Sequence, residues 1–311
     1  MKVVDPQVQS LLEEWAAAPT IPISELTPQI VRISDRDVQA LQDDPEPVRQ
    51  IEEYIASTSV GDIPIRAYLP LKGDAPFPIL IFFHGGGFVI GSESYESSIR
   101  AITNRAECLV CAVQYRLAPE DPFPAAVNDA LAASEWIVKQ ANQLKGDASR
   151  TAIGGDSSGG NLAAIVTLIN SERKVFDLQY QLLIYPMLDA TCSQPSTQEF
   201  GTGYGFTTEK IKWYFDQYLP KGIDRQQQRV SPLFAKNLRD LPPTYIATAE
   251  CDPLRDEAEV YGARLQEAAV PVTLKRYKGM IHGFFQMAGV LDQGKMLIDD
   301  IGLQLKKVFS S

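Results

Sequence analysis

The sequence predicts an α/β fold in which a mostly parallel sheet carries helices on both faces. The main observation is an alternation along the chain. Short apolar runs, typical of strands buried on both faces, are followed by longer segments whose apolar residues recur at helical spacing. The second observation is size, because 311 residues with 45% hydrophobic content suffice for a large core. Sheets of this kind often fill such a length without a second domain.

The first 45 residues differ from the rest and predict a helical appendage. Asp5 and Pro6 suit the N-cap and first position of a helix, and apolar residues follow at helical spacing. The prolines that follow, as far as Pro28, are expected to interrupt the chain. A second short helix is then expected from Ser34 toward Leu41.

From about residue 46 the chain alternates between strand and helix patterns. Two neighbouring strands are expected at 51–58 and 63–69, joined by a hairpin turn at Gly61 and Asp62. Further strands are expected at 78–83, 108–115, 151–153, 181–185, 244–249 and 272–277. Helices are expected between Pro124 and Gly146, at 161–169, at 256–269 and near the C-terminus.

Residues 188–222 break this alternation. The repeated glycines Gly201, Gly203 and Gly205 indicate a mobile connection. Thr208 is then expected to open a short helix that carries four aromatic residues: Trp213, Tyr214, Phe215 and Tyr218.

The charge balance argues against nucleic acid or an anionic membrane as a partner. The chain has 29 Lys and Arg against 39 Asp and Glu, a net charge of −10, so it has no basic surplus to bind phosphate. No apolar run has the length of a membrane span, and the N-terminus lacks the apolar stretch of a signal peptide. A cytoplasmic protein is therefore the default expectation.

Two of the four cysteines, Cys108 and Cys111, have the spacing of a redox or zinc motif. They lie in a predicted buried strand, where residues three apart face opposite sides of the sheet. We therefore expect ordinary buried thiols and no metal site.

The most informative motif is Gly155-x-Ser157-x-Gly159. It lies between an apolar strand pattern and the helix pattern that starts near Asn161. This arrangement resembles the turn on which α/β-hydrolases expose a serine nucleophile, with glycines that let the turn close without side-chain clashes. A serine nucleophile also needs a base, an acid that orients the base, and donors for the oxyanion.

His282 is the expected base. The chain has only two histidines, and in α/β-hydrolases the base follows the serine in sequence, which excludes His84. The acid is expected after the preceding strand. Asp252 lies in that loop, whereas Asp256 begins a helix, where negative charge already suits the dipole. Glu250, at the strand end, is the alternative.

The run from His84 to Gly87 follows a predicted strand and matches the HGGG type of oxyanion loop. Its glycines allow the backbone to approach an acyl group, so that amide N–H groups bind the oxyanion. Ser158, the residue after the nucleophile, supplies another N–H. The alternative reading of the glycines is a flexible loop, and His84 itself is expected to brace the loop.

Together these motifs resemble the hormone-sensitive-lipase family of α/β-hydrolase carboxylesterases. The resemblance spans nearly the whole chain and rests on His84–Phe88, Tyr115–Glu120, Phe123–Ala125, Gly155–Asn161, Asp252–Glu257 and His282–Phe284. It implies an eight-stranded catalytic domain made of 46–187 and 223–311, with a helical cap made of 1–45 and 188–222. It also implies Gly85, Gly86 and Ser158 as oxyanion donors. Ser158 departs from the alanine usual in the family, and its hydroxyl is a candidate to contact the leaving group or cap the helix.

The resemblance implies a serine carboxylesterase that hydrolyses short- to medium-chain acyl esters through an acyl-enzyme, without a metal or organic cofactor. A small-molecule ester is the expected partner, and a homodimer through the edge of the last strand is a further expectation. Two alternatives stay open: hydrolysis of an amide, thioester or lactone with the same residues, and a ligand-binding relative without catalysis. The cap aromatics Trp213, Phe215 and Tyr218 either line the substrate site or form the core of the cap.

Overall fold

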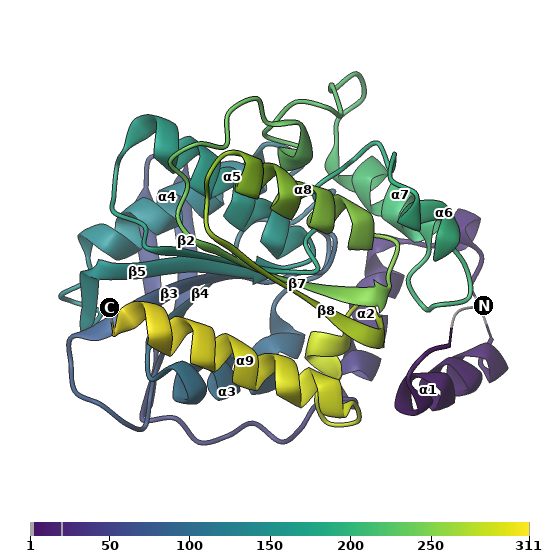
Figure 1. The fold of residues 1–311 in the computed structure, drawn as a ribbon, viewed down its shortest axis with the longest axis horizontal. Coiled ribbons are helices and arrows are strands. Elements are labelled where there is room, and N and C mark those ends of the chain that lie inside the picture. The colour runs from purple at the N-terminus through teal and green to yellow at the C-terminus, as the bar shows by residue number, and fades with distance from the viewer. Residues whose placement is uncertain (1–2, 20, 311) are drawn as a thin grey trace.

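The structure is a computed structural model that describes residues 3–19 and 21–310, without the side chains of 35–37. An eight-stranded sheet runs through it in the order β1-β2-β4-β3-β5-β6-β7-β8 (Figure 1). The first two strands pair antiparallel, as do β2 and β4, and the remaining pairs are parallel. The strands are β1 Gln50–Thr58, β2 Gly61–Leu69, β3 Phe77–Phe83, β4 Leu109–Val113, β5 Gly146–Asp156, β6 Tyr180–Ile184, β7 Thr244–Cys251 and β8 Val272–Ile281.

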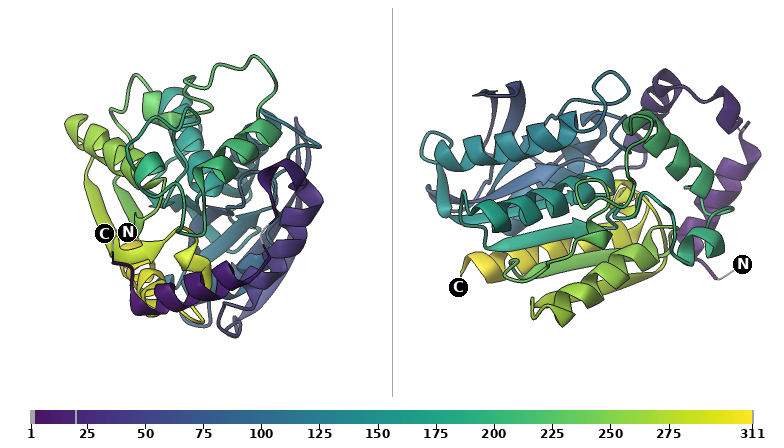
Figure 2. Two further views of the ribbon diagram at one scale, coloured as in Figure 1. Left: turned by 90° about the vertical axis from the view of Figure 1, so that its right-hand side faces the viewer. Right: turned by 90° about the horizontal axis from the view of Figure 1, so that it is seen from above.

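Helices cover both faces of this sheet, as the alternating pattern predicts (Figures 1 and 2). Helices α3 (Glu96–Ala106) and α9 (Asp292–Phe309) pack on each other and on one face. The other face carries α4 (Ala125–Lys139), α5 (Ser158–Arg173) and α8 (Arg255–Glu267). Each face has its own cluster of buried apolar side chains, so the sheet is apolar on both sides.

Helices from two distant parts of the chain gather at one end of the sheet, on the right of Figure 1. They come from the N-terminal segment and from the segment after β6. The left view of Figure 2 looks directly at this end of the molecule. These helices are α1 Pro6–Ala17, α2 Pro28–Gln39, α6 Ser196–Glu199 and α7 Thr208–Tyr218. Short 3-10 turns complete the fold at Ile23–Glu25, Glu93–Tyr95, Pro232–Phe234 and Phe284–Met287.

The structure differs from the sequence prediction at the second helix. It begins at Pro28, because Pro28 occupies the first turn and the Thr27 hydroxyl accepts a hydrogen bond from the Ile30 N–H. The proline starts this helix instead of interrupting the chain. The hairpin turn also lies earlier than expected: Gly61 already pairs with Thr58, so residues 59–60 make the turn. Helix α3 had no counterpart in the prediction.

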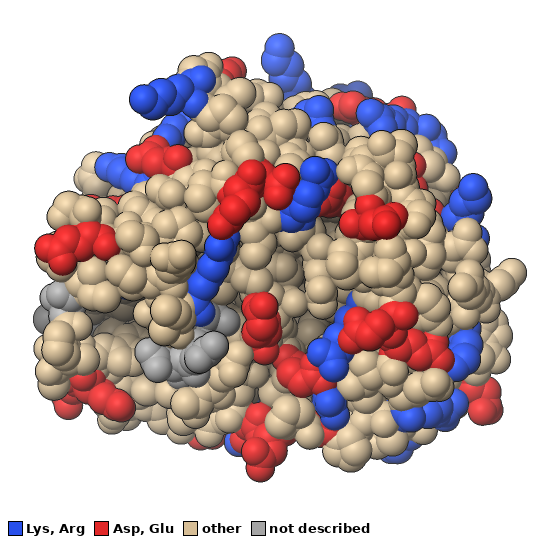
Figure 3. All heavy atoms as spheres, turned by 180° about the vertical axis from the view of Figure 1, so that it is seen from behind, with Lys and Arg blue, Asp and Glu red and all other residues tan. Residues whose placement is uncertain are grey.

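The surface carries charges of both signs. On the face opposite to Figure 1, acidic and basic side chains are interspersed and form no broad basic area (Figure 3). Within the described part of the chain, no helix combines the length and the apolar character that crossing a membrane requires.

Helix α9 offers a matched test of how burial stabilises the fold. Leu305 is fully buried in the cluster that α9 shares with α3, whereas Leu303 on the same helix is 66% exposed. We expect Leu305→Ala to lower the free energy of unfolding by about 2–5 kcal/mol, because it leaves a cavity. Leu303→Ala is expected to change it by about 0.5 kcal/mol or less. Urea denaturation measures both, and equal losses would contradict the packing described here.

Candidate active site

Ser157 lies on a sharp turn between β5 and α5. Its backbone has φ 52° and ψ −119°, a sparsely populated conformation for a residue with a side chain. Such strain costs about 1–3 kcal/mol and persists only where the surroundings impose it. Here the approach of strand and helix is too close for side chains: a Cβ on Gly159 would collide with the Phe83 carbonyl oxygen, and one on Gly155 with the Gly159 backbone. The turn thereby directs the Ser157 side chain away from the sheet.

The structure brings Ser157, His282 and Asp252 into one chain of hydrogen bonds. The Ser157 hydroxyl oxygen is 3.0 Å from Nε2 of His282, and Nδ1 of His282 is 2.8 Å from Oδ2 of Asp252. With Asp252 ionised, Nδ1 carries the proton and donates it to the carboxylate, which leaves Nε2 free to accept from Ser157. The three residues follow β5, β7 and β8, whose parallel carboxyl ends meet at one edge of the sheet.

Of the acidic candidates, only Asp252 reaches the imidazole. It is fully buried, and its second oxygen accepts a hydrogen bond from the Leu254 N–H at 2.8 Å. The Glu250 carboxylate points elsewhere and accepts from the Gly279 N–H at 2.8 Å. Asp256 accepts from the Ser196 N–H at 2.9 Å and from Arg255 at 2.7 Å.

The loop after β3 differs from the prediction at Gly85. Its N–H points at buried side chains, with Oδ1 of Asp156 at 2.8 Å and the Tyr95 hydroxyl at 2.9 Å. This N–H is therefore not available to an oxyanion, and the assignment of Gly85 as a donor is wrong. Among the described residues, the amides of Gly86 and Gly87 donate to no acceptor.

Gly86 and Gly87 both need the freedom of glycine. Their φ angles are 97° and 60°, in the region that favours glycine. A Cβ on Gly86 would lie 2.7 Å from the Cβ of Ile90, and one on Gly87 would collide with the Tyr214 ring. The triple glycine is therefore a tightly packed loop and not a flexible one.

Ser158 links this loop to helix α5. The residue is fully buried, and its hydroxyl accepts a hydrogen bond from the Phe88 N–H at 3.2 Å. Phe88 itself has a φ of 66°, so the bond holds a strained residue next to Gly87. The hydroxyl thus contacts the loop rather than capping the helix.

His84 lies beneath the same loop. Its ring stacks on Tyr115 with centroids 4.3 Å apart, and the Tyr115 hydroxyl donates to the His84 carbonyl oxygen at 2.7 Å. Burial lowers the pKa of His84 to about 4, so the imidazole is neutral at pH 7. These contacts fit the bracing role that the sequence suggested.

Asp156 supports the loop from below. Besides the Gly85 N–H, its carboxylate accepts hydrogen bonds from the hydroxyls of Tyr95 at 2.9 Å and Tyr185 at 3.4 Å. Burial raises the pKa of Asp156 to about 7, although the hydrogen bond from Tyr95 acts in the opposite direction.

The aromatic side chains of α7 divide between core and surface. Phe215 and Tyr218 are buried, and Tyr218 stacks on Phe88 with centroids 3.8 Å apart, which favours the alternative that these two form core. Trp213 is half-buried and packs edge-on against Tyr214, at 5.1 Å between centroids.

The sequence analysis did not single out Phe206. Its ring stacks on His282 with centroids 4.5 Å apart and planes 19° from parallel, and Tyr185 packs at 4.7 Å, also against the imidazole. The available signal was position: Phe206 directly follows the glycine-rich segment that ends at Gly205.

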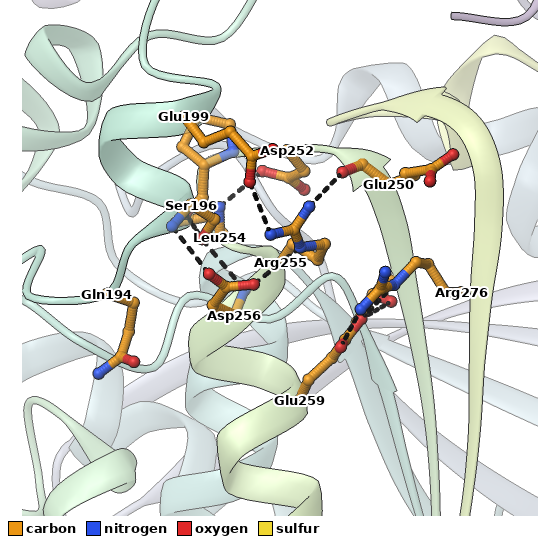
Figure 4. A network of polar contacts seen from close by, with 12 residues as sticks. Gln194, Ser196, Glu199, Glu250, Asp252, Leu254, Arg255, Asp256, Glu259 and Arg276 are labelled. Atoms are coloured by element: carbon orange, nitrogen blue, oxygen red, sulfur yellow. Dashed lines mark hydrogen bonds and ion pairs between the residues drawn. The ribbon is translucent and has the colours of Figure 1, made fainter. Parts of the chain in front are cut away.

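A buried arginine joins the segment that carries Phe206 to the loop of Asp252 (Figure 4). Arg255 is 7% exposed and pairs with Glu199 at 3.0 Å, with Asp256 at 2.7 Å and with the Glu250 carbonyl oxygen at 3.1 Å. The Ser196 hydroxyl adds a bond to the Pro253 carbonyl oxygen at 2.7 Å. The insertion is thus fastened to the loop that holds the acid.

Cavity size does not mark this site. A cavity of about 710 Å³ is lined by residues that include Arg32, Ile90, Tyr115 and Glu120, and none of Ser157, His282 and Asp252 lines it. Arg32 pairs with Glu120 there at 2.7 Å. Acyl transfer depends on the hydrogen-bonded geometry around Ser157 and does not require a large cavity.

Among the described residues, no group of three or more His, Cys, Asp or Glu is arranged to hold a metal ion. Cys108 and Cys111 are free and buried, and burial raises the pKa of the Cys111 thiol to about 12.

Comparisons with known proteins identify the family of the chain. A model of the family described as alpha/beta hydrolase fold matches residues 80–286. The chain is 37% identical over 235 residues to an ethyl acetate hydrolase of Pseudomonas putida, covering 74% of each protein. It is 32% identical over 308 residues to an arylesterase of Saccharolobus solfataricus, covering 98% of this chain and 99% of the relative.

The likeness extends to the three-dimensional structure. An alpha/beta hydrolase enzyme from the metagenome of Lake Arreo, Spain, superposes with a TM-score of 0.96 at 33% identity, with 100% of both chains covered. The chain therefore belongs to the alpha/beta hydrolase fold family, in the hormone-sensitive-lipase branch that its motifs resemble.

Proposed function

We propose that the protein is a serine carboxylesterase that hydrolyses short- to medium-chain acyl esters through a covalent acyl-enzyme. The observation that carries the proposal is the continuous hydrogen-bonded chain from Ser157 through His282 to Asp252. The relatives named as an ethyl acetate hydrolase and an arylesterase support the reaction class.

Acylation starts at the Ser157 hydroxyl. As its oxygen attacks the ester carbonyl carbon, Nε2 of His282 takes the hydroxyl proton. The imidazolium that forms is stabilised by the Asp252 carboxylate, which also holds Nδ1 as the donor. His282 then protonates the leaving alcohol oxygen, and the bond between that oxygen and the carbonyl carbon breaks.

The oxyanion of the tetrahedral intermediate binds to the N–H groups of Gly86, Gly87 and Ser158. Among the residues that the structure describes, the first two donate to no acceptor, and the third lies in the first turn of α5, where amides have no partner within the helix. The links from Asp156 to Gly85 and from Ser158 to Phe88 hold the donors in place before substrate binds. Donors fixed in this way stabilise the transition state without reorganising.

Deacylation repeats these steps with water in place of the alcohol, so the mechanism needs no metal or organic cofactor. Two expectations stay proposals: a homodimer, which the family resemblance implies, and a cytoplasmic location, which the sequence pattern suggests. A homodimer would pair through β8, which lies at the edge of the sheet, and light scattering tests it. A cytoplasmic location is tested by cell fractionation.

The nucleophile is tested by Ser157→Ala. We expect its kcat on p-nitrophenyl acetate or butyrate to fall at least about a thousandfold, because no other group forms the acyl-enzyme. Labelling by a fluorophosphonate is expected to disappear. The neighbouring variant Ser158→Ala keeps its backbone N–H and should still be labelled. Activity of Ser157→Ala within about tenfold of the wild type would contradict the assignment.

The acid is tested by a matched pair of neutral substitutions. Asp252→Asn is expected to lower kcat about 10⁴-fold, because the imidazole loses the partner that sets its tautomer. Glu250→Gln should stay within about threefold of the wild type, since its carboxylate bonds to the Gly279 N–H and not to His282. Steady-state kinetics on p-nitrophenyl acetate decide, and a larger loss in Glu250→Gln would reverse the assignment.

The pKa of Asp156 predicts how stability depends on pH. Because burial raises it from 3.8 to about 7, the folded state binds a proton between these values and the unfolded state does not. The stability that this protonation contributes is fully present below about pH 4 and is lost as the pH rises through about 7. Asp156→Asn removes this loss.

From pH 4.5 to pH 8, the free energy of unfolding of the wild type should therefore fall by about 2–4 kcal/mol relative to that of Asp156→Asn. Urea denaturation across this range measures it, and a difference that does not change with pH would show that the carboxylate titrates normally.

A further inference from the structure

The edge and the faces of the His282 ring have separate roles. Its two nitrogens contact Ser157 and Asp252, so both are engaged by the proposed catalytic residues. Of the aromatic rings packed on the imidazole, Tyr185 is fully buried and bonds to Asp156, whereas Phe206 is partly exposed. Phe206 is therefore the partner of the imidazole that a bound molecule can touch.

The reaction places the alcohol part of an ester next to this ring. The leaving oxygen must come within hydrogen-bonding distance of Nε2 to receive its proton. The group attached to that oxygen then extends from the edge of the imidazole, and Phe206 stacks on that imidazole with centroids only 4.5 Å apart. The acyl group leaves the same carbon in another direction, so it does not share this contact.

Tyr214 extends the aromatic surface toward the oxyanion loop. Its ring lies 6.3 Å from that of Phe206 between centroids and also packs against Gly87. An aromatic wall therefore runs from the proposed base to the proposed oxyanion donors, and Phe206 forms its end beside the leaving group.

The position of Phe206 is fixed by its segment. Gly203 and Gly205 have φ of 84° and 81°, which only glycine adopts readily, and a Cβ on Gly205 would lie 2.8 Å from the Trp15 ring. At the start of the segment, Glu199 is held by Arg255 (Figure 4). The ring is thus preorganised and needs little ordering when substrate binds.

We propose that Phe206 selects the alcohol part of the substrate and favours esters of aromatic alcohols. This inference rests on the proposed esterase function. An aromatic leaving group can stack on or pack edge-on against the Phe206 ring, whereas a small alkyl group cannot make this contact. Aromatic pairs of this kind contribute enough to change a rate about three- to tenfold.

The test compares phenyl acetate, ethyl acetate and phenyl butyrate as substrates of Phe206→Leu, Phe206→Tyr and the wild type. Leucine keeps apolar bulk without the ring, so kcat/KM for phenyl acetate should fall about three- to tenfold more than for ethyl acetate. Tyrosine keeps the ring and should restore the wild-type ratio. The ratio of phenyl acetate to phenyl butyrate should stay within about twofold, because only the acyl group differs.

Deacylation gives an independent readout. Phenyl acetate and ethyl acetate form the same acetyl-enzyme, from which the alcohol has already left. Its hydrolysis rate, from burst kinetics, should change by about twofold or less in Phe206→Leu. Phe176→Leu serves as a control. Phe176 is also partly buried, but it follows the C-terminal end of α5, where its N–H donates to the Asn170 side chain. It should leave all ratios unchanged.

The outcomes distinguish failure of this inference from failure of the proposed esterase function. An equal fall of kcat/KM on all three esters, or slowed deacylation, would show that Phe206 acts on the imidazole alone and would overturn the inference while leaving the esterase function intact. A changed acyl preference would place Phe206 on the acyl side and overturn it too. A wild-type protein without activity on any ester would overturn both.

Discussion

The strained turn at Ser157 is the constraint on which the rest of the site depends. Strand β5 passes into helix α5 so closely that Gly159 packs against the Phe83 carbonyl, where no side chain fits. This close contact imposes a backbone conformation that costs about 1–3 kcal/mol, and burial of both elements offsets that cost. In this conformation the Ser157 hydroxyl faces His282, and the Ser158 amide lies in the first turn of α5, where amides have no partner within the helix.

Two buried hydrogen bonds carry this constraint over to the oxyanion loop. Asp156, just before the nucleophile, binds the Gly85 N–H, and Ser158, just after it, binds the Phe88 N–H. The residues on either side of Ser157 therefore hold the loop at both ends of its glycines. Gly86 and Gly87 lie between these bonds, and this explains how the loop keeps its shape although their amides donate to none of the described residues.

The helical end of the molecule connects to the same centre through different contacts. The N-terminal segment brings Trp15 against Gly205, and the insertion after β6 brings Phe206 onto His282. Arg255 then fastens the insertion to the loop that carries Asp252. Segments that are far apart in sequence thus meet around one imidazole, and the side chain beside the leaving group belongs to the insertion rather than to the sheet.

The sequence by itself determined the alternation of strands and helices and the residues of the hydrogen-bonded chain. His282 was found because only one histidine follows Ser157, and Asp252 because it lies past the preceding strand. The role of Pro28 was predicted wrongly, because a proline can either interrupt the chain or occupy the first turn of a helix. The sequence alone does not distinguish these two roles. Only the tertiary structure decided that the Gly85 N–H donates to Asp156 and that the Phe206 ring stacks on His282. The contacts of Gly85 with Asp156 and of Phe206 with His282 each join residues more than 70 positions apart, and local pattern carries no information about contacts of that range.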